Sequence, residues 1–252
     1  MATRIQRHTG FTLAEVLITL GIIGVVASMI IPTLMQNAQD REIISGLKKT
    51  FSVLSSAYTM AVQEEGEPDT WGITADIAGR VTILNKIKPY LKILKDCSPD
   101  AKRGCFPTDE NYKWLTNDDD MVFDNIGRSL ILADGSIILG QSVVSATCNS
   151  STFGSTLALK HICGIYLVDV NGFKKPNTMG KDTFLFYLTK YGIVPVGSSA
   201  ETWMPFTAHC VNAGGISNGQ GCAAWVIYNE NLDYTKCATE LTSGWTGQTH
   251  CR

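Results

Sequence analysis

The sequence predicts an α+β protein in which one long N-terminal helix packs on an antiparallel β-sheet domain held together by disulfides. Three observations support this prediction: a long apolar run near the N-terminus, short strand-like runs separated by turn residues farther along, and eight cysteines that all lie between Cys97 and Cys251. With 252 residues, the chain can form one substantial domain and an appendage. We expect four segments, at residues 1–10, 11–35, 36–65 and 66–252.

The first two segments have the composition of a leader and a membrane span. Residues 1–10 are polar and include Arg4 and Arg7 but no acidic residue, and residues 16–35 carry no charge. A helix of this length extends about 30 Å, which is the thickness of the hydrocarbon core of a bilayer. Because positively charged segments stay in the cytoplasm, we expect a single membrane crossing with everything after Met35 outside the cytoplasm.

Glu15 lies at the start of the apolar run, where a carboxylate in lipid costs about 3 kcal/mol and needs a partner. The segment from Gly10 to Leu17 (GFTLAEVL) resembles the processing site of type IV prepilins and type II secretion pseudopilins. The resemblance implies that a prepilin peptidase cleaves between Gly10 and Phe11 and methylates the new N-terminus. It also implies that Glu15 neutralises the Phe11 amine of a neighbouring subunit, and pairing makes both buried charges tolerable.

Two alternatives explain the apolar run without such processing. A secretory signal peptide has an apolar core of about 7–15 residues followed by a small-residue cleavage site, and no convincing site of this kind follows residues 16–35. An uncleaved membrane anchor fits the length, but it gives no role to Glu15.

The helix is expected to run from Phe11 to Glu65 and to end at Gly66 and Pro68. Residues that weaken helices occur in the apolar half of this helix and are expected to interrupt or bend it. The family resemblance links such residues to local extension of the helix in a filament. Glycine and proline are also simply more common in membrane helices. The interrupting residues are Gly21, Gly24 and Pro32. In the second half, apolar residues recur at spacings of three and four and predict one core-facing side: Ile43, Ile44, Leu47, Phe51, Leu54, Tyr58 and Val62.

The rest of the chain has the pattern of short strands separated by turns. We expect one short helix over residues 83–94, and an antiparallel sheet that lies on the second half of the long helix. The dipeptide Asp134-Gly135 predicts a hairpin with a type I′ turn. The expected strands are residues 129–133, 136–139, 164–170, 183–188 and 223–228.

The eight cysteines indicate four disulfides in a domain exported to an oxidising compartment. Our hypothesis is local pairing, because each consecutive pair brackets a short polar or glycine-rich loop. The pairs are Cys97 with Cys105, Cys148 with Cys163, Cys210 with Cys222, and Cys237 with Cys251. A metal site that uses neighbouring histidines is the alternative, but the histidine–cysteine spacings match no standard zinc pattern.

The 169–182 loop is the one segment in which the sequence suggests a possible cofactor. Asp169, Asn171 and Asp182 supply oxygen atoms of the kind that Ca²⁺ prefers. Some type II secretion pseudopilins bind calcium in a C-terminal loop, and this segment is similar in kind. It is not an EF-hand loop, and its lysines lower the local negative charge. The alternative is a loop whose side chains cap its own backbone groups.

Together these features predict a polymeric function rather than a catalytic one. We expect a structural subunit, major or minor, of a type IV pilus or a type II secretion pseudopilus. It would start in the bacterial inner membrane. Its partners would be lipid before assembly, prepilin peptidase, the inner-membrane assembly machinery, and copies of itself or related pilins.

Other classes of function have less support in the sequence. The alternative is a membrane-tethered extracytoplasmic binding protein that does not polymerise. A G-x-S-x-G pattern from Gly215 to Gly219 lies in a glycine-rich loop without a following helical pattern, so it does not predict a hydrolase. The net charge of -2 gives no reason to expect nucleic-acid binding.

Overall fold

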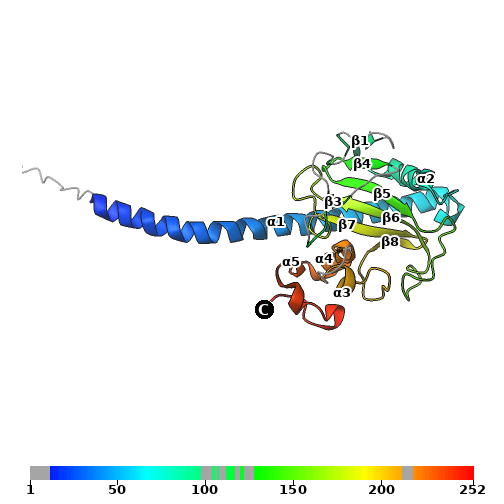
Figure 1. Ribbon diagram of the computed structural model, residues 1–252. Coiled ribbons are helices and arrows are strands. Elements are labelled where there is room, and N and C mark those ends of the chain that lie inside the picture. Colours follow the sequence, from blue (N-terminus) through cyan, green and yellow to red (C-terminus); the bar gives the residue numbers. More distant parts are fainter. Residues whose placement is uncertain are drawn as a thin grey trace, which may run out of the picture. The chain divides into compact units, whose positions relative to one another are not determined.

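The computed structural model describes residues 12–97, 104–105, 107, 112–116, 120–121, 128–211 and 218–252 (Figure 1). The helices are α1 (Leu13–Glu65), α2 (Ile77–Ile87), α3 (Phe206–His209), α4 (Ala223–Asn229) and α5 (Tyr234–Cys237), with short 3₁₀ helices η1 (Pro68–Thr70), η2 (Lys88–Tyr90), η3 (Gln220–Cys222), η4 (Ala238–Glu240) and η5 (Gly244–Thr246). The strands are β1 (Ile93–Cys97), β2 (Tyr112–Lys113), β3 (Asp120–Met121), β4 (Ser129–Leu132), β5 (Ile137–Val143), β6 (Ile162–Asp169), β7 (Thr183–Thr189) and β8 (Gly192–Pro195).

The chain divides into two compact units, Met1–Arg41 and Glu42–Arg252, and α1 contributes residues to both. The described part of the first unit is helical from Leu13 onward. The second unit contains the rest of α1, the sheet and the remaining helices. The α+β class expected from the sequence is therefore confirmed.

Helix α1 is continuous over 53 residues, or about 80 Å. It stays helical through Gly21, Gly24 and Pro32, and the bend or local extension expected at these residues stays a prediction. A proline removes only one backbone hydrogen bond, and the bonds on either side of it are enough to keep a long helix intact. The helix ends where the sequence predicts, because Gly66 adopts a φ of 80° and donates its N–H to Val62 O (3.0 Å). The predicted start at Phe11 lies outside the described residues.

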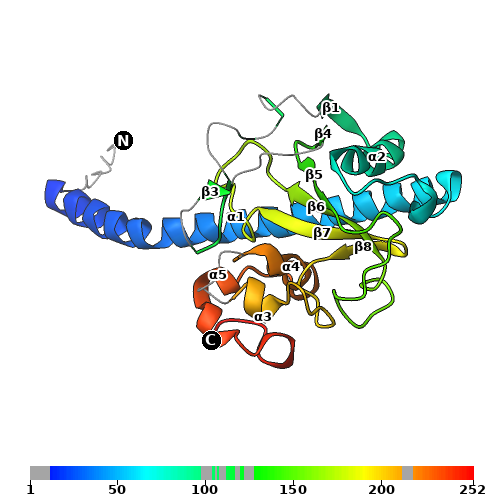
Figure 2. The ribbon, with the colours of Figure 1, turned by 45° about the vertical axis from the view of Figure 1, so that its right-hand side comes forward.

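The main sheet is antiparallel and has the strand order β1-β4-β5-β6-β7-β8, while β2 and β3 form a separate pair (Figure 2). Strand β7 is buried along its whole length, because it lies inside the sheet and is covered on both faces. Four of the five predicted strands correspond to β4, β5, β6 and β7. They were predictable because their apolar runs are bounded by turn residues.

The hairpin between β4 and β5 is confirmed, but its turn is not type I′. Gly135 donates to Leu132 O (2.9 Å), Leu132 donates to Ser136 O (2.9 Å), and within this turn only Gly135 has a positive φ, of 91°. This is a three-residue loop with glycine in the left-handed position. Asp134 instead accepts a hydrogen bond from the Ser136 N–H (3.1 Å), which favours the longer loop.

The second half of α1 packs against one face of the sheet. Its predicted apolar residues are all buried in the core or packed against it, and Phe51 stacks on Phe186 of β7 with ring centroids 5.7 Å apart. The Tyr58 hydroxyl donates to the carbonyls of Thr189 (2.7 Å) and Lys190 (3.0 Å), which joins the end of α1 to the turn after β7. The opposite face of the sheet is covered by loop residues such as Phe153, which form a second apolar cluster with it.

One predicted element is wrong, and another has different bounds. Residues 223–228, expected as a strand, form helix α4; its Trp225 stacks on Phe206 at 4.0 Å, and this packing outweighs the strand propensity of the run. The short helix expected at residues 83–94 is α2, which begins earlier because the Asp76 side chain accepts from Gly79 N–H (3.1 Å). It ends before Pro89, and residues 93–97 belong to edge strand β1.

The described cysteines form four disulfides, and these are the four local pairs of the sequence hypothesis. They close loops of 8, 15, 12 and 14 residues of separation, in chain order. The Cys148–Cys163 bond closes the loop between β5 and β6, and the last two bonds lie in the C-terminal helical region.

Candidate assembly segment and buried carboxylate loops

Thr12 and Glu15 form a reciprocal hydrogen-bonded pair at the start of α1. Glu15 Oε2 accepts from the Thr12 backbone N–H (2.9 Å) and hydroxyl (2.8 Å), and the Glu15 N–H donates to Thr12 Oγ1 (3.3 Å). Thr12 O accepts from Val16 N–H (3.2 Å), so Thr12 is the N-cap of the helix. This arrangement is a capping box. Our sequence expectation for Glu15 covers only an intersubunit partner and misses the box, although Thr-x-x-Glu before an apolar run is its sequence signal.

Glu15 keeps one carboxylate oxygen available. Within the described part of the chain, both Thr12 donors bind Oε2, and Oε1 accepts no hydrogen bond. A carboxylate oxygen without a donor is costly in an apolar environment, so Oε1 is the atom positioned to accept from a second group.

The apolar half of α1 has no packing partner within the described chain. Its large apolar side chains are exposed, from 40% for Val16 to 79% for Leu13. An 18-residue window of α1 has a mean hydropathy of 2.4 and none of its residues is buried, so the helix is long and apolar enough to cross a membrane. A Cβ added at Gly21 or Gly24 would meet nothing within 4 Å. Contacts within this chain therefore do not explain these two glycines.

The model of the family described as the prokaryotic N-terminal methylation motif matches residues 5–31. This range contains the capping box and the first part of the exposed apolar helix. The chain carries a prepilin-type N-terminal signal. No curated protein and no solved structure matches the chain. Gly10 and Phe11, on either side of the predicted cleavage point, lie outside the described residues, so their roles stay predictions.

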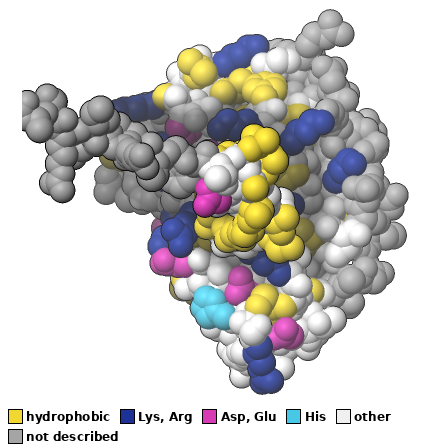
Figure 3. Space-filling model, turned by 90° about the vertical axis from the view of Figure 1, so that its left-hand side faces the viewer, with side chains coloured by type: hydrophobic (Ala, Val, Ile, Leu, Met, Phe, Trp, Pro, Cys, Tyr) yellow, Lys and Arg dark blue, Asp and Glu magenta, His cyan; other side chains and the backbone are white. Residues whose placement is uncertain are grey.

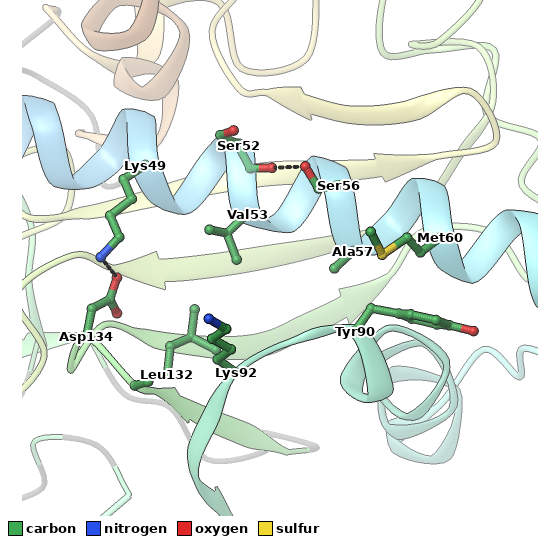
Figure 4. Close-up of a pocket in the computed structure, with 11 residues that line it drawn as sticks. Lys49, Ser52, Val53, Ser56, Ala57, Met60, Tyr90, Lys92, Leu132 and Asp134 are labelled. Atoms are coloured by element: carbon green, nitrogen blue, oxygen red, sulfur yellow. Dashed lines mark hydrogen bonds and ion pairs between the residues drawn. The ribbon is translucent and has the colours of Figure 1, made fainter.

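Beyond the prepilin-type signal, the second half of α1 borders a groove of about 470 Å³ in the second unit (Figure 4). Its apolar lining includes Val53 and Ala57 of α1 and Leu132 of β4. An ion pair between Lys49 Nζ and Asp134 Oδ2 (2.8 Å) closes one end. The groove leaves one side of α1 open to contact, while the opposite side is buried against the sheet.

The charged side chains on the face drawn in Figure 3 are mixed in sign. Lysine and arginine side chains are interspersed with aspartate and glutamate, and apolar side chains gather near the middle of the view. Four of the described ion pairs in this unit join α1 to distant segments, among them Lys48 to Glu230 (2.5 Å) and Glu42 to Lys174 (3.4 Å). The described side chains on this face therefore form no continuous basic patch.

The 169–182 loop brings together the three residues predicted as calcium ligands. Asp169 and Asp182 are fully buried. Asp182 Oδ2 accepts from the Asn171 side-chain amide (3.1 Å) and the Asn177 N–H (2.8 Å), and its Oδ1 accepts from the Thr178 N–H (2.6 Å). The carboxylate of Asp182 thus caps backbone groups of its own loop.

Asp169 is held in the same way. Its Oδ1 accepts from the Gly172 N–H (2.8 Å), and its Oδ2 accepts from the Tyr112 hydroxyl (2.6 Å). Burial and the nearby Asp182 charge raise the pKa of Asp169 well above its usual range, and burial raises the pKa of Asp182 to about 6. These carboxylates therefore titrate at higher pH than exposed ones.

The loop fits calcium only in part. The buried side-chain oxygens of Asn171 and Asn177 have no hydrogen-bond partner among the described residues, which is favourable for a cation. The Asn171 amide nitrogen, however, donates to both Asp182 Oδ2 and Lys175 O (3.2 Å), two oxygens that a cation would also use. Among the described residues there is no group of three or more histidine, cysteine, aspartate or glutamate side chains that could hold a metal ion. The donor arrangement fits a self-capped loop better than a calcium cage.

A third buried carboxylate, Glu201, organises the loop after β8 and was not predicted from the sequence. Its oxygens accept from the Gly197 N–H (2.6 Å), the Met204 N–H (3.1 Å) and the Tyr187 hydroxyl. Burial raises its pKa to about 7. No local pattern marks this residue, because its partners Tyr187 and Gly197 come together only when β7 and the loop after β8 are adjacent.

Proposed function

We propose that this chain is a structural subunit, major or minor, of a type IV pilus or a type II secretion pseudopilus. The observation that carries the proposal is the methylation motif at residues 5–31, which leads directly into an apolar helix with no packing partner in the described chain. Such a helix needs either lipid or other apolar helices around it. A subunit that moves from a membrane into a filament meets both requirements in turn.

In the proposed sequence of events, Arg4 and Arg7 keep the leader in the cytoplasm during insertion. Prepilin peptidase then cleaves after Gly10 and methylates Phe11. The capping box holds Glu15 Oε2 against the start of the helix, which leaves Oε1 to accept the Phe11 amine of a neighbouring copy. Two charges that are each costly in an apolar filament interior become tolerable once they are paired.

The second half of α1 gives the filament its link to the exported domain. One side of it is fixed to the sheet by the Phe51–Phe186 stack and the Tyr58 hydrogen bonds. Its other side, which borders the groove at Val53 and the exposed Met60, is open to a neighbouring subunit. Because α1 contributes residues to both units, it joins the membrane-derived half covalently to the exported domain.

The alternative is a membrane-tethered binding protein that is processed or anchored in the same way but never polymerises. It would also need an apolar helix, but it gives Glu15 Oε1 no partner. Polymerisation predicts that filaments sheared from cells contain this chain, whereas a tether predicts that the chain stays in the membrane fraction.

The experiment combines processing with assembly. The intact mass and N-terminal sequence of the chain from its native membrane should give a start at N-methylated Phe11. Glu15→Ala should be cleaved normally but should be missing from sheared filaments, because the neighbouring amine loses its counter-charge. As a matched control, Glu42→Ala removes an exposed carboxylate from the same helix and should assemble normally. Normal filaments from Glu15→Ala would disprove the assembly role of this residue.

We further propose that the 169–182 loop is structural and needs no calcium. The support is that each oxygen of both carboxylates already accepts a hydrogen bond, from loop donors and, for Asp169 Oδ2, from the Tyr112 hydroxyl. Its role would be to fix the connection between β6 and β7 next to the 112–113 strand.

A further inference from the structure

An exposed tryptophan in the second unit has no role in the proposed assembly. Trp203 is 54% exposed, and its ring stacks on the buried ring of Phe153 with centroids 5.0 Å apart and planes at 29°. Phe153 in turn meets Tyr187 edge-on at 5.6 Å. The indole therefore has one face on a packed aromatic base, while more than half of its surface is open to solvent.

Two loops present this tryptophan, one at residues 149–161 and the other at residues 197–204, and Figures 1 and 2 show both beside β8. The first is closed by the Cys148–Cys163 disulfide. Three hydrogen bonds join the loops: Ser155 N–H to Ala200 O (3.2 Å), Thr202 N–H to Phe153 O (2.9 Å) and Thr202 Oγ1 to Thr152 O (3.0 Å).

The buried side chain of Glu201 holds the second loop in place by hydrogen bonds. It is only 5% exposed, and it accepts from backbone N–H groups at both ends of the loop, at Gly197 and Met204. Its third partner is the Tyr187 hydroxyl of β7. Because the loop is already ordered, a ligand that binds Trp203 does not have to supply the free energy of ordering it.

The two segments that hold the Phe153–Trp203 stack are polar, and the exposed Lys160 lies farther along the first loop. Apart from the buried Glu201, residues 149–156 and 197–204 contain no charged residue. The exposed side chains are mostly hydroxyls, and four of them make no hydrogen bond within the described chain: Ser151, Thr152, Ser155 and Ser199. Rigid aromatic side chains surrounded by serine, threonine, glycine and asparagine are the composition of adaptable recognition surfaces.

We propose that this surface binds a neutral glycan, with the C–H face of a pyranose ring stacked on Trp203. A pyranose has one apolar face and a rim of hydroxyls, which matches an exposed indole surrounded by hydroxyl donors and acceptors. An ionic ligand would find no exposed charged side chain in residues 149–156 or 197–204. A protein partner would bury a broader apolar area than one ring, so the hydroxyl surroundings favour the glycan. This inference does not depend on whether the chain polymerises.

The test is a calorimetric titration of the full-length chain with cellohexaose, maltohexaose and the hexamer of N-acetylglucosamine. The chain is kept in a zwitterionic detergent, because alkyl glycoside detergents carry sugar rings that would compete. At least one oligosaccharide should bind the parent chain. Trp203→Ala should weaken that binding about tenfold or more, and Trp203→Phe should retain most of it because a stacking ring remains.

Two further variants separate binding from folding. Tyr228→Ala removes an aromatic side chain that is 63% exposed on α4 and should bind like the parent. The double variant Ser151→Ala with Ser155→Ala changes only exposed hydroxyls and should weaken binding about threefold or more with an unchanged circular dichroism spectrum. The proposal is overturned if none of the three oligosaccharides binds, or if Trp203→Ala binds as the parent does. If no sugar binds and Trp203→Ala also loses filaments, Trp203 is a subunit contact instead of a glycan site.

Discussion

Glu15 binds Thr12 of its own chain through one carboxylate oxygen and leaves the other oxygen without a hydrogen bond in the described structure. The residue therefore has two separable functions: it caps the helix that carries it, and it presents an acceptor to a neighbouring copy. An N-cap is worth about 1 kcal/mol, whereas a charge left unpaired in an apolar interior costs several times more. The two functions should thus be distinguishable by the size of the effect when each is removed.

Thr12→Ala should reduce filament yield without abolishing it. The substitution removes the hydroxyl that donates to Glu15 and accepts from its N–H, but it keeps the backbone N–H bond and the free Oε1. A loss of about 1 kcal/mol corresponds to about a fivefold change in an equilibrium. Quantification of sheared filaments measures this effect, and Thr12→Ser, which keeps the hydroxyl, is the control. A Thr12→Ala defect as complete as that of Glu15→Ala would contradict the separation of functions.

Tyr58→Phe should destabilise the second unit by about 1–3 kcal/mol. The change leaves the buried ring in place but removes the donor to the Thr189 and Lys190 carbonyls, which then lie buried with one partner fewer. Chemical denaturation of the full chain in detergent, followed by circular dichroism, gives the free energy of unfolding. Tyr228→Phe, which removes a hydroxyl from an exposed ring, should change it by less than about 0.5 kcal/mol.

The free energy of unfolding should fall as the pH rises from about 5 to 7. The pKa of Glu201 is about 7 in the fold against 4.5 ordinarily, and that of Asp182 is about 6 against 3.8. In this range the folded chain binds more protons than the unfolded chain, so raising the pH favours unfolding. Glu201 contributes at most about 3 kcal/mol to this loss.

Denaturation at pH 5, 6, 7 and 8 measures this slope. Glu201→Gln, which does not titrate, should flatten the slope between pH 5 and 7, and Asp182→Asn should flatten it mainly below pH 6. A parent chain that becomes more stable from pH 5 to pH 7 would show that these carboxylates are not protonated in the fold.

Calcium should leave the melting temperature of the chain unchanged. The carboxylates of Asp169 and Asp182 are already held by donors on each oxygen, and a cation would have to displace the Asn171 amide. Thermal unfolding in the presence of excess calcium or of a chelator tests this expectation. A rise with calcium that disappears in Asp182→Asn would instead assign a cation site to the 169–182 loop.

The Cys237–Cys251 disulfide should be the first to react with a mild reductant. Its two cysteines are partly exposed, whereas the other six are at most 1% exposed. Thiolate attack requires access to a sulfur atom, so burial protects the other three bonds. Alkylation after brief treatment, followed by peptide mapping, identifies the bond that opens. Early labelling of Cys97 or Cys148 would show that the core opens more readily than its packing indicates.

Local patterns in the sequence were sufficient for the features that depend on neighbours along the chain. The uncharged run before Met35 and the three-and-four spacing after Ile43 determine α1, because helical faces follow from the backbone period alone. Glycine at residue 135 determines a hairpin, and short cysteine spacings favour local disulfides. The capping box was also present in the sequence, as threonine three residues before Glu15.

Tertiary structure decided the features that depend on contacts between distant segments. Residues 223–228 have strand propensity, yet stacking of Trp225 on Phe206 makes them helical, because packing energy exceeds the small differences in intrinsic preference. The burial of Glu201 requires β7 and the loop after β8 to be adjacent, and that of Asp169 requires the strand that contains Tyr112. A side chain's pKa, its partners and its exposure follow from such neighbours. The sequence alone therefore predicted the prepilin-type signal and the long helix that follows it. The fold determined which carboxylates are buried and which aromatic rings are exposed to a partner.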